Sequence, residues 1–308
     1  MTATMDFYKQ ISDNKKMTYL LFFAFFILIG ILSFFLALIL GGPNIYGLSF
    51  LFIFGIMIIV YALVSYYFCD SIVTAVSGAQ ETKPEDPSYK KLHNIVEEMC
   101  IASGLKKPRV FVINDTAINA FATGRDPEHA IICVTTGAMT LLNRDELQGV
   151  VAHELTHIKN YDIRTMTIAA VLVGVAVLLS DLILRITFYS KHDSDSKNSG
   201  MFIALLIFAL ILAALTPVIA NGIKFAVSRK REYMADAGSA EMTRNPLGLA
   251  SALEKISKDI EPLEAANKAT AHLYISDPLK NTKGMWLKGL FQTHPDINDR
   301  ISRLRGMN

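Results

Sequence analysis

The sequence predicts a mainly α-helical membrane protein, with about four transmembrane helices beside a polar α+β domain that holds a small edge-strand sheet. Two observations predict this class. First, 52% of the 308 residues are hydrophobic and the mean hydropathy is +0.35, with the apolar residues gathered in long uncharged stretches. Second, the polar remainder combines short β-type runs with amphipathic helical patterns.

Charge and cysteine usage exclude other classes. The formal net charge is only +2, and no lysine-rich tract or pattern of stacking aromatic residues predicts a nucleic-acid partner. The three cysteines, Cys69, Cys100 and Cys133, are widely spaced and form no CxxC pair. We therefore expect reduced, buried thiols, and neither a disulfide framework nor a cysteine metal site.

The first apolar stretch predicts a transmembrane hairpin. No charged residue or histidine occurs between Met17 and Cys69, and a bilayer core of about 30 Å needs roughly 20 helical residues. We place the two spans near 17–40 and 46–69, with the GGPN turn between them. A cleaved signal peptide fits poorly, because the first run is too long and no small-residue cleavage site follows it.

A second hairpin is predicted at 165–184 and 201–223, joined by a polar loop at 190–200. The first of these stretches carries one charge, Asp181, and the second carries none. The alternative is a buried helical hairpin in a soluble core. Basic residues flank the outer ends of both hairpins, so the positive-inside rule predicts that both termini and the segment 70–164 lie in the cytoplasm.

The polar parts are predicted to form one domain that the second hairpin divides. The expected order is an N-terminal transmembrane hairpin (1–77), the first part of the polar domain (78–164), the second hairpin (165–226) and the second part of the polar domain (227–308). The polar parts have two kinds of expected element. The helices are 87–104, 143–160, 228–242 and 246–260, and the strands are 109–114, 118–123 and 130–136.

The stretch VVAHELTHIKN at 150–160 predicts a metal site. Positions i and i+4 share one helix face, so His153 and His157 can direct their imidazoles to one point, with Glu154 beside it. In this HExxH arrangement two neutral imidazoles bind Zn²⁺, and the glutamate takes a proton from the attacking water. The alternative is a pair of solvated histidines on a helix surface.

A hydrolytic zinc site needs a third protein ligand. The HExxHxxGxxH pattern is excluded, because Asn160 and Ile163 stand where glycine and histidine are required. The best candidate is Glu232, on a predicted helix after the second hairpin. Asp236, one turn further, can orient a zinc histidine through its other ring N–H. The alternative is a solvated acidic helix face, but two crossings by the hairpin would return Glu232 to the side that holds His157.

Together these residues resemble the HtpX-type membrane zinc metalloproteases, which are relatives of the CAAX prenyl proteases. The resemblance covers nearly the whole chain, from the two N-terminal spans through HELTH to the later EYMADAGSA segment. It implies a gluzincin-type α+β protease domain with one Zn²⁺ per chain. Its implied ligands are His153, His157 and Glu232, with Glu154 as the catalytic base.

The resemblance also implies a substrate strand and two further catalytic residues. NAFATG at 119–124 is similar to the family's edge strand, which receives substrate backbone. The implied substrate-binding residues are Asn119, Ala120, Phe121 and Ala122. THPDINDRISRLR near the C-terminus is similar to the family's HPPxxER segment, so that His294 and Arg300 would stabilise the oxyanion. The sequence departs from that segment at Asp296 and Asp299, and the alternative is an ordinary amphipathic helix.

These features predict a zinc metalloendopeptidase of the bacterial inner membrane, multi-pass, with its protease domain in the cytoplasm. Its expected partners are the lipid bilayer and protein substrates, above all misfolded or damaged membrane proteins under stress. One alternative is a site-2-type intramembrane protease, although the HExxH helix is too polar for a bilayer core and NPLG at 245–248 lacks the required aspartate. The other is a non-catalytic zinc-binding scaffold, chaperone or transporter.

Overall fold

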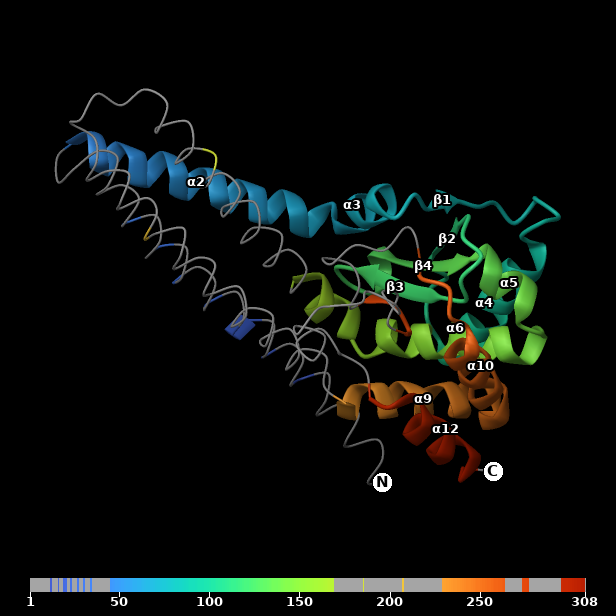
Figure 1. Ribbon diagram of the computed structural model, residues 1–308. Helices are drawn as coiled ribbons and strands as arrows, with labels where there is room; N and C mark the ends of the chain where they lie inside the picture. Colours follow the sequence, from blue (N-terminus) through green and yellow to red (C-terminus); the bar gives the residue numbers. More distant parts are fainter. Residues whose placement is uncertain are drawn as a thin grey trace.

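The computed structural model describes residues 45–168, 229–263, 273–276 and 295–307, together with a few single residues elsewhere. Apart from a few single residues, the predicted first span and most of the second hairpin at 165–223 lie outside these described residues, as does His294. The described part consists of a long N-terminal helix and an α+β domain (Figure 1).

The N-terminal helix α2 (Ile45–Tyr67) is followed by a short helix, α3 (Cys69–Val76). Figure 1 shows α2 extending away from the α+β domain, and most of its apolar side chains whose exposure is described are exposed, as at Ile53 (68%), whereas Ala62 near its C-terminal end is buried. Among the described residues, no single helix is both long and apolar enough to cross a membrane. The segments Gly55–Tyr67 and Cys69–Val76, which meet at an angle of 76°, have the length and composition of a span only when taken together.

The α+β domain contains a four-stranded sheet in the order β1-β2-β4-β3. Its strands are β1 (Gln80–Glu81), β2 (Arg109–Ile113), β3 (Ala120–Gly124) and β4 (Ala130–Thr135). β2 and β4 run parallel, whereas β1 and β3 are antiparallel to their neighbours. The apolar runs of β2 and β4 fit central strands that are covered on both faces, and β3 forms one edge.

Helices cover one face of this sheet. They are α4 (Lys90–Ser103) and α6 (Arg144–Lys159). Further from the sheet, α9 (Arg229–Thr243) and α10 (Pro246–Lys258) pack against α6, and α12 (Ile297–Arg305) packs against α10 and α9. The short elements η1 (Pro127–His129) and α5 (Thr136–Leu141) flank β4. The sequence predicted α4, α6, α9 and α10 to within about three residues at each end.

The HExxH helix α6 is the centre of the domain. It begins with a capping box, in which the Asn143 side chain accepts from the Glu146 backbone N–H and the Glu146 side chain accepts from that of Asn143. The Glu146 carboxylate also binds Ser251 (2.6 Å) and Lys255 (2.7 Å) of α10. A Cβ on Gly149 would lie 2.7 Å from the Leu249 backbone nitrogen, so α6 and α10 pack nearly backbone to backbone.

The opposite face of the sheet is covered partly by α3. Val73 of α3 packs in one cluster with Phe111, Phe121 and Cys133 of the sheet. Arg109 of β2 forms an ion pair with Asp70 of α3. These contacts fix the end of the N-terminal helix pair to the domain that carries the candidate site.

Candidate metal and catalytic site

The helix α6 brings the two HExxH histidines together. Their Nε2 atoms lie 3.2 Å apart, and both side chains are buried. This follows from the i, i+4 spacing, which places the rings one turn apart on the same face. Glu154 is also buried, and its negative charge helps to raise the pKa of His157 and that of Arg300.

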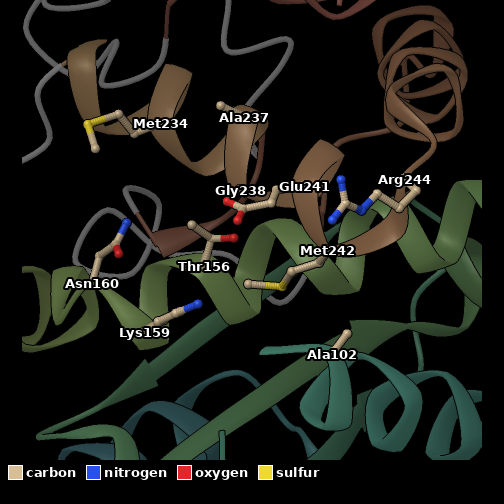
Figure 2. Close-up of a pocket in the computed structure, with 10 residues that line it drawn as sticks. All are labelled: Ala102, Thr156, Lys159, Asn160, Met234, Ala237, Gly238, Glu241, Met242 and Arg244. Atoms are coloured by element: carbon tan, nitrogen blue, oxygen red, sulfur yellow. The ribbon is translucent and has the colours of Figure 1, made fainter. Parts of the chain in front are cut away.

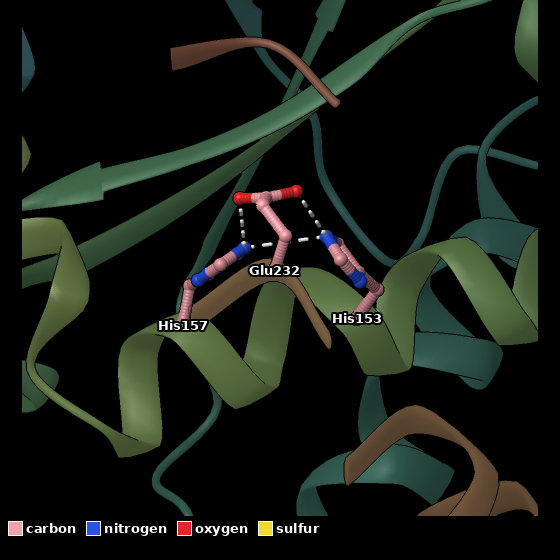
Figure 3. A group of neighbouring side chains, drawn as sticks. All are labelled: His153, His157 and Glu232. Atoms are coloured by element: carbon pink, nitrogen blue, oxygen red, sulfur yellow. Dashed lines mark hydrogen bonds and ion pairs between the residues drawn. The ribbon is translucent and has the colours of Figure 1, made fainter. Parts of the chain in front are cut away.

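The third member of the cluster comes from α9. The Glu232 carboxylate is fully buried, with Oε1 3.5 Å from Nε2 of His157 and Oε2 3.8 Å from Nε2 of His153. Figure 3 shows the three side chains converging from two helices. All three potential ligand atoms lie within 4.8 Å of one another, so the group could hold a metal ion. Two imidazole nitrogens and one carboxylate oxygen form a donor set that suits Zn²⁺.

Each histidine has its own carboxylate on the side away from the cluster. Nδ1 of His153 lies 3.0 Å from Oδ1 of Asp236, and Nδ1 of His157 lies 2.9 Å from Oδ2 of Asp162. A carboxylate at Nδ1 holds the proton there and leaves the Nε2 lone pair directed at the centre, which is the usual support of a metal-binding histidine.

Sequence reasoning singled out Asp236 and missed Asp162. The available signal was an aspartate just beyond the HExxH helix, in the stretch NYDIR. Tyr161 adopts a positive φ of 61° directly after α6, and this turn brings the buried Asp162 back toward His157. No helical spacing rule applies across such a turn, so the pairing could not be read from periodicity.

Two buried arginines balance these carboxylates. Arg300 of α12 donates to Asp236 through both Nε (2.9 Å) and Nη2 (2.7 Å), and its Nη1 lies 3.5 Å from Oε2 of Glu232. Arg231 places Nη1 3.6 Å from Oδ1 of Asp162. Although burial opposes the charged form, Arg300 and His153 hold the pKa of Asp236 below its ordinary value.

The two histidines differ in their affinity for protons. Burial lowers the pKa of His153 to about 4, and nearby Arg300 also opposes its protonation. Burial acts in the same direction on His157, but Asp162 and Glu232 outweigh it and raise the pKa to about 9. The carboxylates of Asp162 and Glu232 therefore favour a positive charge at this point, and a bound cation would supply such a charge.

The predicted substrate residues lie at the start of the edge strand β3, and Arg300 lies beside the cluster. Asn119 is buried at the start of β3, and its side-chain oxygen accepts from the Ala120 backbone N–H (3.1 Å). Arg300 reaches the cluster through Asp236, and its Nη2 also lies 3.4 Å from Nε2 of His153. His294, its predicted partner, is outside the described residues.

A separate pocket of about 490 Å³ lies between α6, α9 and the end of α4 (Figure 2). Its lining combines charged side chains, such as Lys159, Glu241 and Arg244, with the apolar Met234 and Met242. The described residues that line this pocket include no member of the His-His-Glu cluster. The pocket is therefore distinct from the candidate metal site.

The α+β fold, the HExxH helix and the buried His-His-Glu cluster define a metalloprotease. The chain belongs to peptidase family M48, whose family model matches residues 88–308. The matched region contains the whole cluster and both supporting aspartates.

Curated relatives are similar over nearly the entire chain. A protease HtpX homolog of Dictyoglomus thermophilum is 45% identical over 309 residues, which cover 98% of this chain and 95% of the relative. A protease HtpX homolog of Thermoanaerobacter pseudethanolicus is 41% identical, with 97% of each chain covered. One from Streptococcus agalactiae serotype III is also 41% identical, with 97% of this chain and 99% of the relative covered.

A solved structure, the S. mikatae Ste24p crystal structure, is more distantly similar. It is 20% identical, with a TM-score of 0.49, and the match covers 91% of this chain. This chain spans 66% of the length of that protein.

Proposed function

We propose that this protein is a zinc-dependent, membrane-bound endopeptidase that hydrolyses peptide bonds of misfolded or damaged membrane and cytosolic proteins. The observation that carries the proposal is the convergence of two imidazole Nε2 atoms and the Glu232 carboxylate, each imidazole backed by its own aspartate. Membership of peptidase family M48 supports a hydrolytic role for that cluster. Quality control under stress follows from the likeness to HtpX proteases and from anchoring beside other membrane proteins.

The mechanism assigns a role to each buried group. When bound, zinc would supply a Lewis acid and lower the pKa of a bound water toward about 7. His153, His157 and Glu232 would hold the ion, while Asp236 and Asp162 keep both imidazoles oriented. Glu154 would accept the proton of the attacking water and pass it to the leaving amine. Arg300 would steady Asp236 and add positive charge near the reacting carbonyl, and His294 is proposed to act beside it.

Membrane anchoring is proposed from the sequence of the two apolar hairpins. The exposed apolar surface of α2 supports the first of them. Basic residues flank the hairpins on the side that carries the protease domain, so the positive-inside rule favours a cytoplasmic position for that domain. Substrates would then be protein segments that reach the cytoplasmic face of the membrane.

The test is the Glu154→Gln variant of the full chain in detergent, with β-casein as the substrate. The amide cannot accept the proton, so we expect cleavage to fall by at least about 10²-fold. Bound zinc should stay near one per chain, because Glu154 is not a proposed ligand. Cleavage and zinc content are measured on the same preparation.

The matched control is Glu241→Gln, the same chemical change at an exposed glutamate of α9. It should retain both cleavage and zinc. Wild-type cleavage by Glu154→Gln would refute the assigned base. Zinc in the wild-type protein without cleavage that a chelator inhibits would favour the non-catalytic scaffold.

A further inference from the structure

The segment 273–276 lies beside the outer edge of β3, the strand proposed to receive substrate. Tyr274 forms an antiparallel bridge with Phe121, and the Ile275 backbone N–H donates to the Ala120 carbonyl oxygen at 2.9 Å. Figure 1 shows this short red-orange segment beside β3. We call residues 273–276 the strap.

The strap also approaches the metal cluster. The Ile275 carbonyl oxygen accepts from Nη1 of Arg300 at 3.4 Å, and the same nitrogen lies 3.5 Å from Oε2 of Glu232. The Arg300 side chain therefore bridges the Ile275 carbonyl oxygen of the strap and the proposed zinc ligand Glu232. An extended substrate paired with β3 would bring a backbone carbonyl to this same region.

The side chains of Tyr274 and Ile275 in the strap pack on opposite faces of the sheet. The Tyr274 ring meets the Phe121 ring edge to face, with centroids 4.9 Å apart, and belongs to the cluster on the α3 side. Ile275 belongs to the cluster on the α6 side. Both residues are almost fully buried, so the strap is packed against β3 from both sides of the sheet.

The backbone pairing of the strap is nevertheless short. Within the described residues it amounts to one isolated bridge, whereas β4 pairs with all five residues of β3. The Ala120 N–H donates to the side chain of Asn119. An extended polypeptide that ran along the whole edge could gain more backbone hydrogen bonds than the strap makes.

We propose that the strap occupies the place of substrate on β3, and that a substrate must displace it with an extended segment long enough to pair along this strand. The inference rests on the proposed function, because it takes β3 as the substrate strand. It makes the strap a determinant of specificity. Unfolded chains can supply such a segment, whereas folded surfaces and very short peptides cannot.

The direct test is Ile275→Pro, which removes the N–H that donates to Ala120. If the strap competes with substrate, weakening it lowers the KM for β-casein and leaves kcat unchanged. Loss of one backbone hydrogen bond predicts a fall in KM of about two- to tenfold. Ile275→Val keeps the N–H and most of the apolar side chain, so its KM should stay near the wild-type value.

An unchanged or higher KM in folded Ile275→Pro would overturn the proposal, because the strap would then not compete with substrate. If the proline variant fails to fold, the proposal is tested instead by amide hydrogen exchange of the Glu154→Gln variant, which binds substrate without cleaving it. Addition of β-casein should speed exchange of the Ile275 amide, which substrate would expose. Unchanged or slower exchange would again overturn the proposal.

The two hypotheses fail in different ways. If the wild-type protein cleaves nothing, the proposed protease function fails, while the exchange measurement still reports whether casein displaces the strap. If the wild-type protein cleaves casein but neither the KM nor the exchange rate responds as expected, the strap proposal alone fails.

Discussion

At the scale of single residues, the site depends on how each histidine is supported. Asp236 and Asp162 contact His153 and His157 at Nδ1, and both aspartates are buried. Buried carboxylates are costly unless they are paired, and here arginines lie near both. The two imidazoles are therefore held in the orientation that metal binding requires before any ion arrives.

We predict that Asp162→Asn weakens zinc binding about 10- to 100-fold, the usual effect of losing a carboxylate behind a metal-binding histidine. The amide keeps the shape of the side chain but removes the charge that holds the proton at Nδ1 of His157. Competition with a chelating zinc indicator measures the affinity. Asp145→Asn, at an exposed position in the first turn of the same helix, should bind zinc as the wild type does; equal affinity in Asp162→Asn would remove Asp162 from the site.

Sequence reasoning could find His153, His157 and Glu232 because their spacing and their shared chemistry are visible in the chain. It could not find Asp162, which a turn at Tyr161 brings to His157. It also could not show that Arg300 contacts Asp236 with two nitrogens, since that contact depends on how α12 packs against α9.

At the scale of elements, the position of Glu232 depends on the close packing of α9 against α6. A Cβ on Gly238 of α9 would lie 2.5 Å from Cγ2 and 2.6 Å from Oγ1 of Thr156. Thr156 is buried, and its hydroxyl donates to the Ala152 carbonyl oxygen, so its side chain cannot easily move away. The absence of a side chain at Gly238 allows α9 to bring its carboxylate to the histidines.

We predict that Gly238→Ala lowers stability by about 1–3 kcal/mol through overpacking and weakens zinc binding by moving Glu232. Thr156→Ala removes the two nearest atoms that the new methyl group would meet and leaves only Cβ, at 3.2 Å, so the double variant should recover much of both losses. Thermal unfolding and zinc affinity are measured for both single variants and for the double variant. A double variant no better than Gly238→Ala would show that this contact does not position α9.

The strongly periodic helices and the apolar strands β2 and β4 were predictable, since each carries its own pattern. The strand β1 was missed because two polar residues, Gln80 and Glu81, contain no alternation. The strap was missed for a related reason. Its pairing with β3 joins positions about 150 apart in the chain, and nothing local in its four residues predicts that partner.

At the scale of the whole molecule, the proposed site requires the second hairpin to cross the membrane twice. The loop at 190–200 would then face away from the cytoplasm. We predict that Ser194→Cys reacts with a membrane-impermeant maleimide in intact cells, whereas Ser257→Cys, exposed on α10, reacts only after permeabilisation. The native cysteines are buried, so background labelling should be low; labelling of Ser194→Cys only after permeabilisation would refute the double crossing.

The distance in sequence between the members of the cluster determines when the cluster can form in the nascent chain. Both histidines leave the ribosome about 75 residues before Glu232, a delay of roughly 4–15 s at ordinary rates of translation. Arg300, which steadies Asp236, is made later still. Until Glu232 has been made, the polypeptide lacks the third member of the cluster, so the proposed hydrolytic centre cannot form during that interval of translation.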